Sequence, residues 1–189
     1  MNRRLTALAG AALLALTGCG GADADEDLAT CLLGTWEGNP DEVGADFATQ
    51  FADLGEVTDV ASSGRTLATY EGDRVTWDYR DLRFEVTFAE PGLGVVVAMS
   101  GREDARYAVT DDEVLVDDAR NLDATMQMLV EFDGETVDVM AGVDLDEVAA
   151  AMPSRLFTMT CAGDALAATL VESGGQPYPN GPVNTFERR

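Results

Sequence analysis

Few side chains in this sequence could do acid–base or nucleophilic chemistry. The chain contains no histidine, which excludes a Ser-His-Asp or Cys-His mechanism, a histidine-ligated zinc ion and an imidazole base near neutral pH. Two acidic clusters, Asp111-Asp112-Glu113 and Asp117-Asp118, are dense enough to consider for glycoside hydrolysis by paired carboxylates. Acids clustered in the turns of a strongly acidic protein are usually solvated. The sequence therefore favours a protein that is not an enzyme.

The sequence also lacks the motifs that usually bind metal ions or cofactors. Asp144 and Asp146 offer carboxylates for calcium, but they lack the spacing and the turn glycine of an EF-hand loop. The chain contains no glycine-rich phosphate loop and no nucleotide-binding fingerprint. We therefore predict no metal site and no cofactor.

The beginning of the chain carries a reactive thiol in a distinctive setting. Arg3 and Arg4 precede an uncharged run, Leu5 to Gly18, which is shorter than the roughly 20 apolar residues that span a bilayer. The segment Leu16-Thr17-Gly18-Cys19 resembles the lipobox of bacterial lipoproteins. The resemblance implies that residues 1–18 are a signal peptide and that the Cys19 thiol carries acyl groups.

A lipid on Cys19 would hold the protein on a membrane without a transmembrane helix. We therefore expect a lipid-anchored, extracytoplasmic protein of the cell envelope, at the outer membrane or the cell surface, with residues 19–29 as an acidic flexible tether. One alternative is an ordinary secretory signal with an accidental Cys19. Another is a twin-arginine signal at Arg3-Arg4, disfavoured because Thr6 and Ala7 replace stronger hydrophobes.

The charge of the chain restricts its partners. The formal net charge is −23, and every basic residue is Arg. Such a field repels nucleic acid and anionic headgroups, so a nucleic-acid partner is excluded. The remaining length suits one domain, residues 30–171.

Two further cysteines, Cys31 and Cys161, remain after Cys19 is assigned to the lipid. In an oxidising compartment two thiols most simply form one disulfide, and this one would close nearly the whole domain. Two separate buried thiols are the alternative.

The apolar pattern is mostly that of half-buried strands. A first strand, 32–36, is followed by a helix over 40–54, in which Val43, Phe47, Phe51 and Leu54 share one face. From about residue 57 to 132 the period is two, which predicts an antiparallel meander. Turns are expected at 62–64, 71–73, 91–92, 110–112 and 133–134.

The last third of the domain adds one helix and a hairpin. A strand over 126–132 continues past the Asp-Gly turn to residues 136–140, and a capping-box-like Asp144 with Glu147 begins a short helix, 145–151. Strands over 156–160 and 165–171 follow. Residues 172–189 are rich in Gly and Pro and are predicted to form an exposed tail.

Gly34-Thr35-Trp36 in the first strand, followed by a helix and a long meander, resembles the calycin superfamily of lipocalins and fatty-acid-binding proteins. The resemblance implies an up-and-down barrel in which Gly34 lets the chain bend and Trp36 plugs the floor. The late-strand motifs of both branches are missing, so no ligand residue is transferred. A small-residue bend beside a core Trp in another sheet protein remains the alternative.

The fold class predicted is therefore mainly β, an antiparallel up-and-down barrel or a strongly curved sheet, with one helix after the first strand and a short helix before the last hairpin. Such a barrel could hold a small apolar ligand or be filled by its own side chains. The candidate ligand contacts are Trp36, Trp77, Phe84, Phe88, Met126 and Met128. An accessory protein of an envelope complex, with an unknown partner, is the alternative function.

Overall fold

The computed structural model describes residues 27–189, except 50, 52–53, 112, 179–180 and 182. The expected signal peptide, Cys19 and most of the expected tether therefore lie outside the described residues. Within the described part of the chain, no helix is long and apolar enough to cross a membrane.

Eight antiparallel strands form a closed barrel, which is one of the two architectures predicted from the sequence. The barrel strands are β1 Gly34–Gly38, β2 Val57–Glu71, β3 Arg74–Phe88, β4 Gly94–Thr110, β5 Glu113–Asn121, β8 Arg155–Ala162, β9 Ala165–Ser173 and β11 Val183–Arg188. Their spatial order is β3-β2-β1-β11-β9-β8-β5-β4, and the pairing of β3 with β4 closes the circle.

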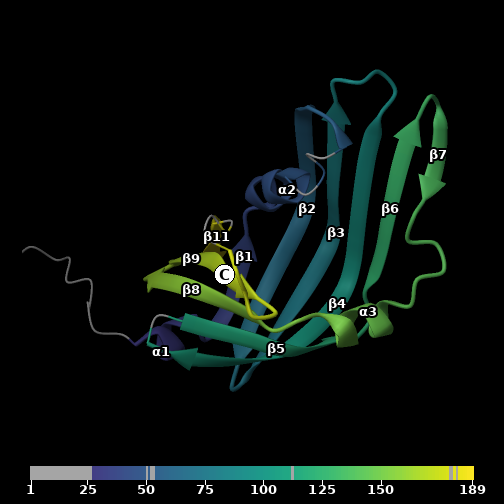
Figure 1. Ribbon diagram of the computed structural model, residues 1–189. Coiled ribbons are helices and arrows are strands. Elements are labelled where there is room, and N and C mark those ends of the chain that lie inside the picture. The colour runs from purple at the N-terminus through teal and green to yellow at the C-terminus, as the bar shows by residue number, and fades with distance from the viewer. Residues whose placement is uncertain (1–26, 50, 52–53, 112, 179–180, 182) are drawn as a thin grey trace, which may run out of the picture.

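Beyond the barrel the longest strands continue into an open sheet (Figure 1). The first half of β4, Gly94 to Ser100, pairs with β6 Thr125–Phe132 instead of β5. The outer strand, β7 Glu135–Asp138, pairs with β6 through an Asp-Gly turn in which Asp133 and Gly134 both have positive φ. We call the part formed by β6, β7 and the adjoining halves of β2, β3 and β4 the open sheet.

The turn expected at 62–64 is wrong, because β2 runs through these residues. The register between β2 and β3 shifts at Ser63/Arg65, and Gly64 has φ +82°. A Cβ atom on Gly64 would lie 2.1 Å from the carbonyl oxygen of Asp81, so the two strands approach closely at this bulge. Positive φ at Gly64 thus bends the sheet without ending the strand.

The prediction of an exposed tail over 172–189 is also wrong. Gly174 and Gly175 have positive φ and lead into the short strand β10 Gln176–Pro177. The chain then returns as β11, which lies between β9 and β1. Gly174 and Gly175 therefore form a turn within this segment, which continues to a barrel strand.

Helix α2, Pro40–Thr49, begins where the sequence predicted, although the prediction extended it to residue 54. A helix that was not predicted, α1 Leu28–Leu32, comes before β1 and is N-capped by Asp27. Residues 32 and 33 were expected in the first strand, but that strand begins at Gly34. The run of apolar residues did not distinguish the last turn of a buried helix from a strand.

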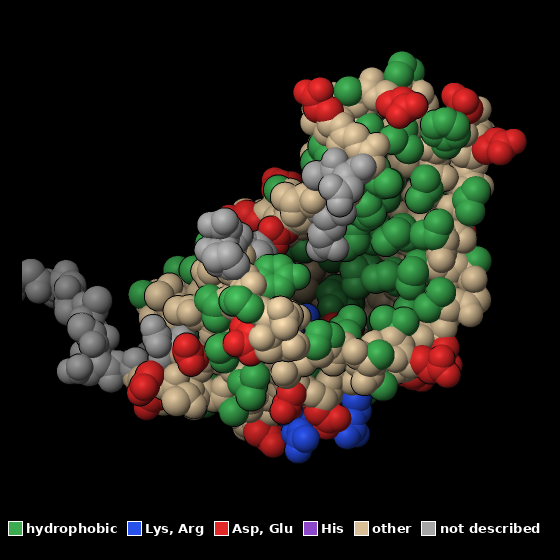
Figure 2. All heavy atoms as spheres, viewed as in Figure 1, with side chains coloured by type: hydrophobic (Ala, Val, Ile, Leu, Met, Phe, Trp, Pro, Cys, Tyr) green, Lys and Arg blue, Asp and Glu red, His purple; other side chains and the backbone are tan. Residues whose placement is uncertain are grey.

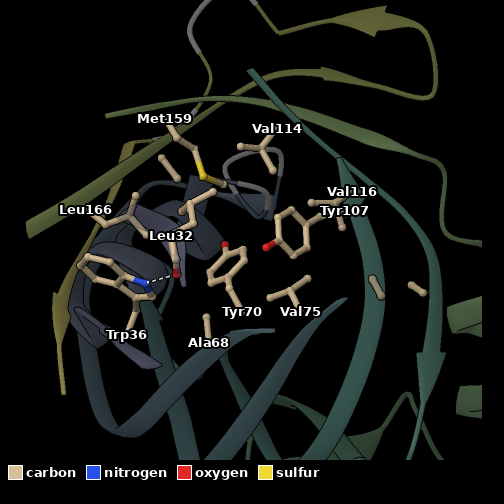
Figure 3. Packing of buried hydrophobic residues seen from close by; sticks show 13 residues of the cluster. Leu32, Trp36, Ala68, Tyr70, Val75, Tyr107, Val114, Val116, Met159 and Leu166 are labelled. Carbon is tan, nitrogen blue, oxygen red and sulfur yellow. Dashed lines mark hydrogen bonds between the residues drawn. The ribbon is translucent and has the colours of Figure 1, made fainter. Parts of the chain in front are cut away.

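The predicted disulfide is present. Cys31 in α1 and Cys161 near the end of β8 are bonded, with their Cα atoms 6.1 Å apart. Leu32 and Trp36 are fully buried, and the Trp36 indole donates a hydrogen bond of 2.8 Å to the Leu32 carbonyl (Figure 3). Helix α1 therefore covers the end of the barrel at which β1 begins.

The short helix α3, Leu145–Ala151, has the predicted bounds. The Asp144 carboxylate accepts hydrogen bonds from the backbone N–H groups of Asp146 and Glu147. We expect Asp144→Ala to lower the free energy of unfolding by about 1 kcal/mol, because two N–H groups lose their acceptor. Urea denaturation measures this change, and Asp144→Asn, which retains an acceptor, should stay within about 0.5 kcal/mol of wild type. Equal losses in both variants would contradict the capping role.

Candidate functional site

A cavity of about 340 Å³, partly open to solvent, lies in the half of the barrel that faces the open sheet. The register places this half at the end of β1, because Thr66 of the cavity wall pairs with Gly38 and with Tyr79. Figure 2 shows a hollow lined by hydrophobic side chains between the barrel and the open sheet. The volume lies in the range of small-molecule sites, roughly 300–1,000 Å³.

Strand β3 contributes more lining residues than any other strand, because its inward positions continue from the barrel into the open sheet. Trp77 and Tyr79 face the barrel interior, and after the bulge Leu82 and Phe84 continue the same wall. The other apolar lining residues on the barrel strands are Met99, Val116, Phe157, Met159, Ala168 and Phe186.

Helix α2 covers one side of the cavity. Val43 and Phe47 line it, and the Phe47 ring stacks on Phe84 with 5.8 Å between the ring centroids. Gly44 lies directly against the sheet, since a Cβ atom there would be 3.0 Å from a carbon of the Phe84 ring. The helix is further held by Glu42, whose carboxylate accepts hydrogen bonds from the Thr185 backbone and hydroxyl on β11.

Two opposite charges face the cavity. The Tyr79 hydroxyl donates a hydrogen bond of 2.8 Å to the Glu103 carboxylate. The Arg155 guanidinium lies 5.6 Å from the centroid of the Trp77 ring and forms no ion pair with any described residue. The wall is therefore amphipathic, with one cation and one anion among aromatic and aliphatic side chains.

Two buried oxygen atoms of the wall also lack partners. Among the described residues, neither Thr66 Oγ1 nor Asn184 Oδ1 has a hydrogen-bond partner, and both residues line the cavity. Thr66 is only 9% exposed. Buried polar atoms without partners are uncommon in folded proteins, so these two are candidate contacts for a ligand.

The tyrosines of this region stay protonated. Burial raises the pKa of Tyr79 well above its ordinary value, and the neighbouring Glu103 raises it further, with a smaller opposing effect of Arg155. Burial likewise raises the pKa of Tyr70, with a further contribution from Tyr107. Both hydroxyls are therefore hydrogen-bond donors near neutral pH and are unsuited to act as phenolate bases.

The structure brings only part of the predicted ligand set together. Trp77 and Phe84 line the cavity. Trp36 does not, because it is fully buried in the barrel core beside α1. Phe88 is buried in the open sheet, and Met126 and Met128 stand half-buried on β6, outside the cavity lining.

The polar groups of the cavity were missed in the sequence, although a signal was present. Arg155 is in phase with the inward residues Phe157 and Met159 on β8, and Glu103 is in phase with Ala105 on β4. A charged residue in phase with buried positions of a strand points to the interior. Thr66 and Asn184 carry no comparable signal.

The acidic clusters do not form a second site among the described residues. Asp118 forms ion pairs with Arg106 and Arg120 at 3.2 and 3.1 Å on the exposed surface. No group of three or more Cys, Asp or Glu side chains in the described part of the chain is placed to hold a metal ion.

The fold and the cavity define a closed antiparallel β-barrel that opens onto a curved sheet. No match was found to a protein-family model, to a curated protein or to a solved structure.

Proposed function

We propose that this chain is a lipid-anchored, extracytoplasmic protein that binds a small apolar ligand in its barrel cavity and catalyses no reaction. The observation that carries the proposal is the cavity of about 340 Å³, lined largely by aromatic and aliphatic side chains. Apolar side chains that line a water-filled cavity remain in contact with water. An apolar ligand that displaces this water buries them, which favours binding.

The location rests on two independent features. The lipobox-like segment ending at Cys19 indicates export and acylation. The Cys31–Cys161 disulfide is typical of an oxidising compartment outside the cytoplasm.

Binding should be visible in the fluorescence of Trp77. The chain has two tryptophans, and only Trp77 lines the cavity. In the full chain carrying Cys19→Ser, decanol should produce a saturable blue shift, because the alcohol displaces water from around this indole. The shift should persist in Trp36→Phe and disappear in Trp77→Phe. An equal shift in both variants, or no saturable shift in wild type, would argue against a ligand in the cavity.

Acylation has its own test. We expect Cys19→Ser to abolish incorporation of a radiolabelled fatty acid in cells and to leave an unprocessed or soluble protein, because the acceptor thiol is gone. The matched control is the double variant Cys31→Ser and Cys161→Ser, which should still be labelled. Normal labelling of the Cys19→Ser protein would refute the lipobox interpretation.

A second candidate function is that of an accessory protein in an envelope complex. The open sheet extends beyond the barrel and carries the exposed apolar residues Phe132 and Val137. With Val139 and Val143 in the segment that follows β7, these residues are 41–57% exposed. A pull-down comparing wild type with Val137→Asp tests this alternative. Deletion of residues 172–189 is unsuitable, since it would remove β11 from the barrel.

A further inference from the structure

The cavity is lined by one acidic and one basic side chain that do not pair with each other. Glu103 and Arg155 line the same cavity, yet they form no ion pair with each other. Opposite charges attract strongly where water is partly excluded. A geometry that keeps them apart therefore leaves each charge able to interact with a third group.

Each charge is held by a different neighbour. The Tyr79 hydroxyl donates to Glu103, and the two side chains come from adjacent strands, β3 and β4. Arg155 comes from β8 and lies over the face of Trp77 on β3, so its side chain reaches across the barrel interior. Stacking on an indole stabilises a guanidinium and leaves its N–H groups at the edge available for hydrogen bonds.

The unpartnered oxygens add to this pattern. Thr66 Oγ1 and Asn184 Oδ1 are buried oxygens without partners among the described residues. The threonine hydroxyl can donate or accept a hydrogen bond, whereas the amide oxygen only accepts. Asn184 Oδ1 and Glu103 favour a ligand group that donates hydrogen bonds or carries positive charge, whereas Arg155 favours an acceptor or an anion.

Amphiphiles of a single charge fit this wall less well. An anionic group would satisfy Arg155 but would be repelled by Glu103 and by a chain of net charge −23. A cationic group would satisfy Glu103 but would place a like charge near the Arg155 guanidinium. A headgroup that carries both charges can satisfy both residues at once.

We propose that the cavity binds a single-chain zwitterionic amphiphile. Its cationic group contacts Glu103, its anionic group contacts Arg155, and its apolar chain runs past Leu82 and Phe84 toward the open sheet. The inference rests on the proposed function and adds the class of headgroup to it.

Four dodecyl amphiphiles test the proposal by calorimetric titration below their micelle concentrations, with the full chain carrying Cys19→Ser. They are dodecylphosphocholine, dodecanoate, dodecyltrimethylammonium and the neutral dodecyl maltoside. We expect wild type to bind dodecylphosphocholine at least about tenfold more tightly than the other three, which corresponds to one charge-assisted contact. A preference for the anionic, cationic or neutral amphiphile would overturn the proposal.

Two variants, each of which removes one charge, assign the roles of Glu103 and Arg155. Glu103→Gln should weaken dodecylphosphocholine about tenfold and shift the preference toward dodecanoate, whereas Arg155→Gln should shift it toward dodecyltrimethylammonium. The exposed Glu85, which pairs with Arg83, supplies the control, and Glu85→Gln should leave all four affinities unchanged. Equal losses for all four amphiphiles in both cavity variants would overturn the assignment.

The outcomes distinguish a failure of the headgroup proposal from a failure of the proposed function. If a cavity variant does not fold, the order of affinities in wild type still decides the headgroup. If decanol binds but the charged headgroups make no difference, the inference fails and the proposed function stands. If neither decanol nor any dodecyl amphiphile binds, the proposed function fails.

Discussion

Removing the Cys31–Cys161 disulfide is expected to lower the free energy of unfolding by about 4–5 kcal/mol. The two cysteines are separated by 130 positions in the sequence, so the bond closes a loop that contains β1 to β7 and most of β8. A crosslink across so long a loop strongly restricts the unfolded chain. It also ties α1, with its fully buried Leu32, to the end of β8.

Urea denaturation of the double variant Cys31→Ser and Cys161→Ser against wild type measures this effect. Adding a reductant should lower the stability of wild type to that of the variant and should leave the variant unchanged. Thiol labelling of the denatured, unreduced mature protein provides the check. Two free thiols would contradict both the crosslink and the stability that we assign to it.

Gly101→Ala is expected to lower the free energy of unfolding by about 3–4 kcal/mol. Gly101 has φ +92°, and a Cβ atom there would lie 1.7 Å from the carbonyl oxygen of Asp123. The substitution therefore adds the strain of positive φ, about 1–2 kcal/mol, to a steric overlap that only a backbone shift can relieve.

Gly134→Ala is the matched control for this prediction. Gly134 also has positive φ, +81°, but a Cβ atom there meets nothing within 4 Å, so only the strain of about 1–2 kcal/mol is expected. Equal losses in the two variants would show that the close approach at Gly101 does not matter. Because β4 changes its partner from β6 to β5 at this position, such a result would also contradict our account of how the barrel joins the open sheet.

The antiparallel β-sheet architecture follows from features that the sequence displays. Alternation along Leu82, Phe84, Val86 and Phe88 marks one buried face, and these residues are 1–4% exposed in the structure. The Asp133-Gly134 hairpin and the Asp144 cap also formed as predicted, because both depend on local backbone chemistry.

The division into a barrel and an open sheet could not be predicted from the sequence. It depends on which strand β4 pairs with along its length, and that choice is set by contacts between distant segments. Gly64 looks like a turn residue in the sequence, because its positive φ is the same in a turn and in a bulge. The strand β11 was not predicted, because the Gly and Pro residues before it suggested an exposed tail.

The candidate site was predicted in part. Trp77 and Phe84 were identified because large apolar residues on alternating positions face an interior. The same argument selected Trp36, which fills the barrel core, because periodicity gives the face of a strand and not the height along the barrel. The opposed charges of Glu103 and Arg155 emerge only when β4 and β8 are placed around one cavity.

Native mass spectrometry of the protein purified from its own envelope tests the central claim most directly. The claim predicts that part of the protein carries a bound small amphiphile and that Ala168→Phe, which fills the cavity from β9, removes the adduct. The exposed Val183→Phe on β11 should retain it. A chain that carries no adduct from its native membrane, together with a cavity that stays empty when decanol is added, would contradict the account.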